Sequence, residues 1–313
     1  MTKTDTEYNI RYVRNRLIDK GKWDACILSS DLPLIYATST YLDGMCHQWD
    51  ALITDDYAVV MPLPWKKKWM LAYVYSPYFV IAGGVFGKEV SEALLTAFIK
   101  AIPHRFLLID LDLNERNFFP DTLLKDNILF KQRRNTWLPL NRSYEDIFAD
   151  YNTSVKRKLK KAASHHFCVD KSLQTERVIN LYKQYYRNQD SVVSRFDFAN
   201  MISLLGEKLS NQTRTYILSF PDGEVCAFYL LLFDDNYVYW LLGGSTEKGK
   251  ESNAFYYLTD AVIRDFADSN RTFRFEGSDH EGIQFFNRQF GGQTVHYPRI
   301  KINRLPWPLR YLK

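Results

Sequence analysis

The chain has 313 residues, of which 46% are hydrophobic and 25% charged, so it is long enough for two folded domains of ordinary composition. Its net charge of +5 is too small to indicate nucleic-acid binding by itself and fits an anionic small ligand equally well. The four cysteines form no CxxC pair, which argues against a zinc site and a disulfide framework and for a reducing cytoplasm.

The first part of the chain predicts strands and one helix. The strands are expected at 57–62, 69–75 and 106–113, and as two strands around KQRR within 127–140. The polar sequence WKKKW (65–69) is interpreted as a turn between the first two strands. A helical pattern over 88–102 ends before Pro103.

The second part begins with helices and returns to strands. The helices are predicted at 143–151, 153–163, 174–187, 195–209, 253–268 and 280–290. The strands are predicted at 213–220, 224–234, 236–244, 271–276 and near 294–303, with PDG (221–223) as a hairpin turn.

Both halves of the chain share one pattern. The sequence YVY at 73–75 and again at 237–239 is followed in each case by a glycine pair, a predicted helix and a strand that ends in an acid. The two acids matched in this way are Asp110 and Glu276. Because a strand–helix–strand crossover joins parallel neighbours, the pattern predicts two copies of one α/β unit, with coincidence as the alternative.

This pattern gives the predicted fold class, which is α/β (α+β) with two units. Each unit is expected to be a mixed, mostly antiparallel sheet flanked by helices. The predicted units are residues 1–140 and 141–313, with the last residues packing back on the first unit.

The segment between the third strand of the second half and the next helix is the candidate donor-binding loop. The residues expected to bind the donor are Gly243, Gly244, Ser245, Lys250, Ser252 and Asn253. Free amides at a helix N-terminus, with Lys248 and Lys250 nearby, suit a phosphate or pyrophosphate. The alternative is that Ser252 or Asn253 only caps the helix.

Glu276 is the candidate general base. Ligands of open α/β sheets gather at strand carboxyl ends, and a partly buried carboxylate can take the proton of an attacking amine. The alternative is a strand-end glutamate in a salt bridge or a helix cap. Asp279 is interpreted more simply as the N-cap of helix 280–290.

The acceptor amine is expected in a cleft between the two units. Tyr75, Asp110 and Asp279 are the candidate substrate-binding residues, and Tyr239 and Glu276 are expected on the catalytic side of the cleft. A backbone amide near 242–244 would polarise the donor carbonyl.

Five basic residues lie close together at 156–161. Val155, Leu159 and Ala162 form a stripe that faces inward and leaves the basic side chains on the wetter faces. A solvated helix face is one interpretation, and contact with the phosphates of a nucleotide, CoA or RNA is the other.

The order of the segments VKRKLKKA, YVYWLLGGS, FRFEGSD and FFNRQFGG resembles the acyltransferase domain of the GNAT superfamily, in particular its FemAB-like branch. The resemblance covers most of the chain and is strongest from about 145 to 293. Members of that branch contain two GNAT-like units in tandem. They are typified by enzymes that add amino acids from aminoacyl-tRNA to peptidoglycan precursors.

Two positions depart from the pattern of that branch. Its sequence Phe-Lys-x-x-Phe-Gly is matched at 286–291 with Asn287 in place of the lysine, which in the aminoacyl-tRNA enzymes is implicated in stabilising transition-state charge. Asn287 is therefore a candidate catalytic residue that can donate a hydrogen bond but brings no charge, which argues against an aminoacyl-tRNA donor. The GNAT pyrophosphate motif is also incomplete in EKGKESNA, which argues against acetyl-CoA.

The resemblance implies an N-acyltransferase that moves an acyl or aminoacyl group from an activated donor to an amine. Acyl-CoA is the favoured donor co-substrate and aminoacyl-tRNA the second, with no tightly bound cofactor. The implied acceptor is a small molecule or a cell-envelope precursor, and RNA is the less favoured partner. The alternatives are a non-catalytic ligand-binding or scaffold protein with the double fold, and an aminoacyl-tRNA-dependent ligase.

The expected location is the cytoplasm. The N-terminus lacks the apolar core of a signal peptide, and the longest apolar run, 73–86, is too short to span a bilayer. The histidines form no HExxH motif, and no metal site is expected. The first unit lacks an equivalent anion loop and is expected to bind the acceptor without catalysing the reaction.

Overall fold

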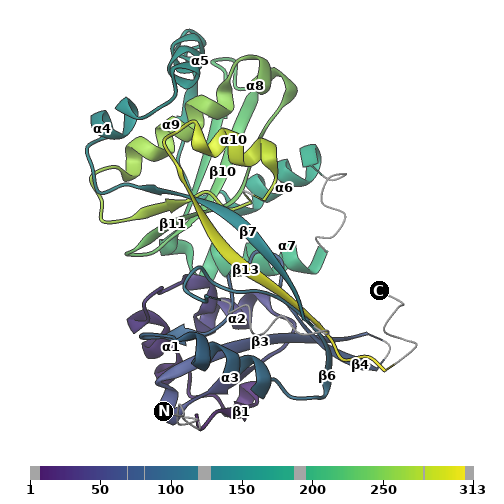
Figure 1. The fold of residues 1–313 in the computed structure, drawn as a ribbon. Coiled ribbons are helices and arrows are strands. Elements are labelled where there is room, and N and C mark those ends of the chain that lie inside the picture. Colours follow the sequence, from purple (N-terminus) through teal and green to yellow (C-terminus); the bar gives the residue numbers. More distant parts are fainter. Residues whose placement is uncertain are drawn as a thin grey trace. The chain divides into compact units, whose positions relative to one another are not determined.

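The computed structural model describes residues 8–68, 70–80, 82–118, 128–186, 195–277 and 279–306 (Figure 1). The chain forms two compact units, one made of 1–133 with 296–313 and the other of 134–295. The chain enters the second unit within β7 (Ile128–Pro139) and leaves it within β13 (Gln293–Asn303). The predicted boundary after residue 140 therefore lies just beyond the strand in which the units divide.

The first unit has a mixed sheet in the order β1-β2-β3-β4-β6-β13, with β5 paired to β3. Its further strands are β1 (Arg11–Val13), β2 (Trp49–Ile53), β3 (Val59–Lys68), β4 (Leu71–Tyr75), β5 (Phe86–Gly87) and β6 (Phe106–Asp112). Its helices are α1 (Lys20–Ser29), α2 (Ser39–Met45) and α3 (Glu92–Ala101). Strands β4 and β6 are parallel and are joined through α3, as the crossover pattern predicts.

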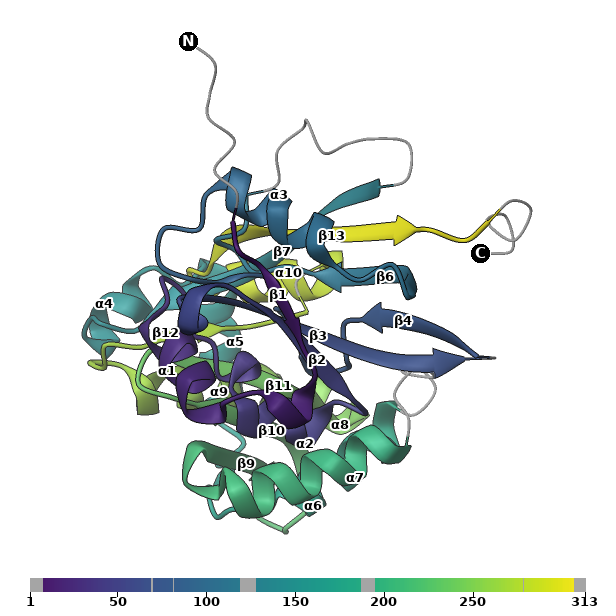
Figure 2. The ribbon, with the colours of Figure 1, turned by 90° about the horizontal axis from the view of Figure 1, so that it is seen from below.

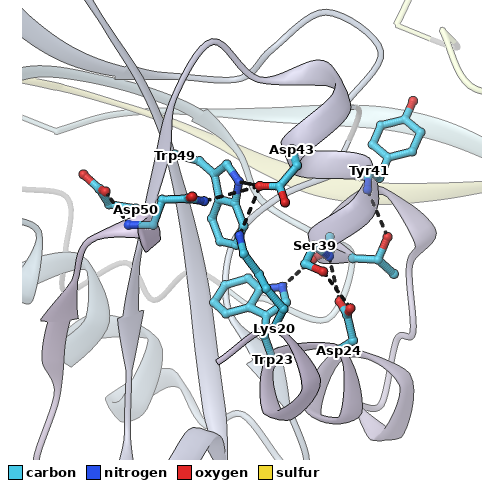
Figure 3. A network of polar contacts seen from close by, with 11 residues as sticks. Lys20, Trp23, Asp24, Ser39, Tyr41, Asp43, Trp49 and Asp50 are labelled. Carbon is cyan, nitrogen blue, oxygen red and sulfur yellow. Dashed lines mark hydrogen bonds and ion pairs between the residues drawn. The ribbon is translucent and has the colours of Figure 1, made fainter. Parts of the chain in front are cut away.

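Polar contacts hold the N-terminal helices of the first unit together (Figure 3). The Asp24 carboxylate in α1 accepts hydrogen bonds from the Ser39 backbone N–H at 2.6 Å and from its hydroxyl at 2.7 Å. The Asp43 carboxylate in α2 accepts from the Trp49 indole N–H at 2.8 Å and pairs with Lys20 at 3.1 Å. Helices α1 and α2 and strands β1 and β2 lie outside the elements predicted from the sequence.

The second unit has a sheet in the order β7-β12-β11-β10-β9-β8. Its strands are completed by β8 (Cys168–Asp170), β9 (Thr213–Ser219), β10 (Val225–Phe233), β11 (Tyr237–Ser245) and β12 (Thr272–Arg274). Its helices are α4 (Tyr144–Ala149), α5 (Thr153–Ala163), α6 (Thr175–Tyr186), α7 (Arg195–Ser203), α8 (Glu247–Glu251), α9 (Ala254–Phe266) and α10 (Glu281–Arg288). Strands β11 and β12 are parallel, whereas the pairs β7–β12, β10–β11, β9–β10 and β8–β9 are antiparallel, which confirms the predicted fold class.

Burial explains how the second unit is layered. Strand β10 is buried along almost its whole length, because α9 covers one face of the sheet and α6 the other (Figure 2). Helix α5 buries the predicted stripe of Val155, Leu159 and Ala162 and packs against α9. Among the described helices, none is both long and apolar enough to cross a lipid bilayer.

Three predictions of local structure differ from the structure. The residues 65–68 of WKKKW continue β3, where they pair with β4, and KQRR lies inside the single strand β7. The predicted helix at 195–209 is divided into α7 and a π-helical turn at Leu204–Lys208. Trp69, Asn127 and Arg187, at the ends of predicted elements, lie outside the described residues.

Candidate functional site

Strands β11 and β12 pair for three residues, after which β12 ends and β11 continues. Tyr237–Tyr239 lie opposite Thr272–Arg274, where β12 ends, while β11 continues to Ser245 along β10. The register between β10 and β11 shifts at this point and leaves Leu241 without an opposite residue. Such a β-bulge re-aims the backbone and is frequent beside active sites. The end of β11 is therefore paired with β10 along one edge, whereas β12 does not extend along its other edge.

The backbone groups on this second edge belong to Gly243 and Ser245. Gly244 lies opposite Phe228 of β10, and the N–H that follows Ser245 donates to β10 at 3.0 Å. Since successive residues of a strand direct their backbone groups to opposite edges, those of Gly243 and Ser245 point away from β10. The Tyr186 hydroxyl accepts from the Ser245 N–H at 3.1 Å and donates to the Ser245 carbonyl at 3.3 Å. The Gly243 N–H faces no strand in the part of the chain that the structure describes.

The predicted donor loop forms the short helix α8. Its two lysines are held in surface ion pairs, Lys250 with Glu247 at 2.6 Å and Lys248 with Glu224. Both lysine side chains remain about half exposed, and surface pairs of this kind contribute little free energy. The role of Lys250 in anion binding stays a prediction.

Helix α9 starts without a side-chain cap. Asn253 occupies the N-cap position with a left-handed backbone (φ 57°), and its side chain makes no capping hydrogen bond. The Ser252 hydroxyl donates to the Gly249 carbonyl at 3.2 Å. Asn253 therefore holds one of the two predicted cap positions, but neither side chain caps α9 by a hydrogen bond. The amides of the first turn of α9 have no side-chain acceptor from the cap, and such a helix end suits an anion.

Glu276 lies in a buried polar cluster just beyond β12. Its side chain is 3% exposed and pairs with the Arg274 guanidinium, with 3.0 Å between Nε and Oε1. The Asn135 side-chain amide donates to Glu276 Oε2 at 2.7 Å, and its oxygen accepts from the Glu276 N–H at 3.1 Å. Glu276 also has a left-handed backbone (φ 52°), a strained conformation that proteins concentrate at functional sites.

Arg274 connects Glu276 to the predicted catalytic residue Tyr239. The guanidinium is fully buried and lies over the rings of Trp137, Tyr237 and Tyr239, at 5.0, 5.4 and 5.8 Å from their centroids. The Tyr239 hydroxyl donates to the Asp234 carboxylate at 2.7 Å, and burial raises the pKa of that carboxyl. Tyr239 thus forms a wall of the buried arginine site.

Two further predicted site residues are Asn287 in α10 and Asp279 just before this helix. Asn287 is completely buried within the second unit. Asp279 is not the N-cap, because α10 begins at Glu281 and the cap position is His280. The roles of Asn287 in catalysis and of Asp279 in substrate binding stay predictions.

The strand register corrects the internal match. In the first unit Tyr75 lies opposite Asp110, and in the second Tyr239 lies opposite Arg274. Asp110 therefore corresponds to Arg274, and Asp112 corresponds to Glu276. Asp112 is also buried, where burial raises the pKa of its carboxyl while Arg133, at 3.0 Å, opposes the shift. Tyr75 and Asp110 belong to the first unit, so the acceptor site stays a prediction.

The basic helix α5 has two kinds of side chain. Lys156 donates to the Ala149 carbonyl at 2.7 Å, and Lys158 donates to the Tyr256 hydroxyl of α9 at 2.6 Å. Arg157, Lys160 and Lys161 are exposed and form no ion pair with a described residue. These three charges remain available to an anionic partner.

The described residues contain no group of three His, Cys, Asp or Glu side chains placed to hold a metal ion. Cys226, at the start of β10, is buried and donates to the Leu218 carbonyl at 3.2 Å, and burial raises the pKa of its thiol to about 12. The polar groups of the site are backbone amides, hydroxyls, and the buried Arg274–Glu276 pair with the Asn135 side-chain amide.

Residues 149–281 match the family model of the acetyltransferase (GNAT) domain. No curated protein matches the sequence significantly. The fold is similar to that of FemX (13% identity, TM-score 0.67, covering 96% of this chain and 99% of that one). It is also similar to that of a conserved protein of unknown function from Bacteroides thetaiotaomicron (9% identity, TM-score 0.60, covering 95% of this chain and 100% of that one). A tandem GNAT protein from the clavulanic acid biosynthesis pathway is also similar in fold. It has 11% sequence identity and a TM-score of 0.55, and the match covers 95% of this chain and 99% of that one.

Proposed function

We propose that this chain, which has the FemAB-like fold of the GNAT superfamily, transfers an acyl or aminoacyl group from an activated ester or thioester to an amine. The observation that carries the proposal is that β11 continues beyond the end of β12 inside the matched domain. It leaves the Gly243 N–H on an open strand edge, and a backbone N–H fixed in this way can polarise an acyl carbonyl.

In this reaction the amine nitrogen attacks the carbonyl carbon of the donor. A C–N bond forms, the C–S or C–O bond to the donor breaks, and the leaving thiolate or alkoxide takes up a proton. The Gly243 N–H stabilises the negative charge that develops on the carbonyl oxygen. Glu276 is assigned to accept the proton of the attacking amine.

The donor runs from Gly243 along β11 towards the start of α9. The uncapped first turn of α9 supports a phosphate-bearing donor such as acyl-CoA, with Ser245, Ser252 and Lys250 beside it. The acceptor is an amine on a small molecule or a cell-envelope precursor.

A second candidate donor is an aminoacyl ester on RNA. The unpaired charges of Arg157, Lys160 and Lys161 favour it, because clustered basic side chains contribute most of the affinity for a phosphate backbone.

Mass spectrometry of the products tests the proposed activity. The protein is incubated with an amine mixture and, separately, with acetyl-CoA, longer acyl-CoAs and aminoacyl-tRNA. We expect amide formation with at least one donor, at a rate well above that without protein. Stabilisation of the fold by a donor that is never consumed would instead support a non-catalytic binding protein.

Reversing the charge of Lys160 tests the RNA candidate. Lys160→Glu is expected to weaken RNA binding and to reduce the slope of log affinity against log salt by about one or more, since a phosphate contact is lost. Binding is measured by fluorescence anisotropy between about 50 and 200 mM salt. Lys208→Glu, an exposed lysine after α7, makes the same change in net charge as a control. Equal effects of the two variants would argue against a site on α5.

A further inference from the structure

Tyr186, the last residue of α6, covers the open edge of β11. A Cβ atom added to Gly244 would overlap the Tyr186 ring, so the ring lies where only glycine leaves room. The ring stacks on Tyr182 with centroids 5.3 Å apart and an interplanar angle of 19°. Its hydroxyl bonds both backbone groups of Ser245, at 3.1 and 3.3 Å. Tyr186 is therefore held from two sides and occupies the last hydrogen-bonding position of the edge.

The spacing along β11 relates this position to the donor. The backbone groups of Gly243 and Ser245 lie two residues apart, which is about 6.8 Å along a strand. In a CoA thioester a sulfur and two methylenes separate the carbonyl carbon from the first amide of the arm, a span of about 6 Å when extended. A donor whose carbonyl bonds the Gly243 N–H would therefore bring that amide to Ser245, where the Tyr186 hydroxyl already bonds both groups.

We propose that Tyr186 determines which donors bind along the edge of β11. It selects esters and thioesters that carry no amide group at the distance from the acyl carbonyl that separates Ser245 from Gly243, about 6.8 Å. The inference rests on the proposed function and, of its two candidate donors, favours the aminoacyl ester over acyl-CoA, which carries this amide. Such a donor pairs with Gly243 and leaves the Tyr186 contacts intact. A donor with the amide must displace the hydroxyl from Ser245, and losing hydrogen bonds of this kind lowers its kcat/KM about tenfold.

Two small acetyl thioesters test the proposal without phosphate or RNA. S-Acetyl-N-acetylcysteamine carries the amide, and the acetyl thioester of 2-methoxyethanethiol lacks it. Tyr186→Phe keeps the ring packing and removes the hydroxyl. We expect it to raise kcat/KM for the first thioester about tenfold and to change that for the second less than twofold. Tyr185→Phe, at the exposed neighbouring tyrosine, is expected to change neither.

The outcomes separate the inference from the proposed function. Equal changes for the two thioesters, or none for either, would overturn the role of Tyr186 while acyl transfer stands. No transfer from either thioester by the wild type and both variants, while another donor is consumed, would also overturn this role. No transfer from any donor would overturn the proposed function and this inference together.

Discussion

Replacing Arg274 by methionine is expected to lower the free energy of unfolding by about 3–5 kcal/mol. Arg274 and Glu276 are 0% and 3% exposed, and their ion pair spans 3.0 Å. Without the guanidinium, the Glu276 carboxylate stays buried with the neutral amide of Asn135 beside it. Removing one partner of a buried ion pair costs far more than the lost attraction of a surface pair. Urea unfolding followed by circular dichroism measures the change.

Two comparisons assign this effect to the buried charge. Arg288→Met removes an exposed arginine from α10 and is expected to change stability by less than about 0.5 kcal/mol. The double variant Arg274→Met/Glu276→Gln removes both charges and is expected to recover part of the loss. A cost below about 1 kcal/mol for Arg274→Met, or no recovery in the double variant, would contradict the prediction.

The sequence predicts regular elements well where one face is buried throughout. The stripe of α5 and the apolar run of β10 are examples, because their periodicity reflects burial directly. The prediction fails in β7, where KQRR has the polarity of a turn. Arg133 continues the strand because it pairs with Asp112 at 3.0 Å, and a pattern of polarity does not contain that partner.

The internal match shows a second limit. When the two halves are aligned by their motifs, Asp110 matches Glu276. When they are aligned by the register of their parallel strands, Asp110 matches Arg274. A shift of two residues keeps side chains on the same face of a strand, so hydrophobic alternation does not detect it. Register depends on backbone pairing, which only the folded chain defines.

The candidate site was predicted in part. The Gly243-Gly244-Ser245 segment lies where β11 continues past the end of β12, and Glu276 lies just beyond β12. Arg274, Asn135 and Tyr186 were missed. Arg274 carries a visible signal, since a lone arginine between two phenylalanines in a strand must find a buried partner. Asn135 and Tyr186 have no such signal in the sequence, because they belong to β7 and α6, which are far from the site residues along the chain.

Replacing Glu276 by glutamine is expected to lower turnover about 10²–10⁴-fold, since the attacking amine loses the group assigned to accept its proton. The same change also removes the Glu276 charge from its buried ion pair with Arg274, so slow turnover by itself does not separate chemistry from folding. Turnover is therefore measured per folded molecule, well below the unfolding temperature. Glu281→Gln, at an exposed glutamate in the first turn of α10, is the matched control and should retain normal turnover.

The double variant Arg274→Met/Glu276→Gln separates the two roles of Glu276. It removes the buried charge imbalance, so stability is expected to return in part. If Glu276 accepts the proton, the double variant remains as slow as Glu276→Gln, because restored packing does not restore a base. If Glu276 only holds Arg274 and the strand end in place, turnover recovers together with stability. Recovery would remove Glu276 from the chemistry and leave the Gly243 N–H as the assigned catalytic group.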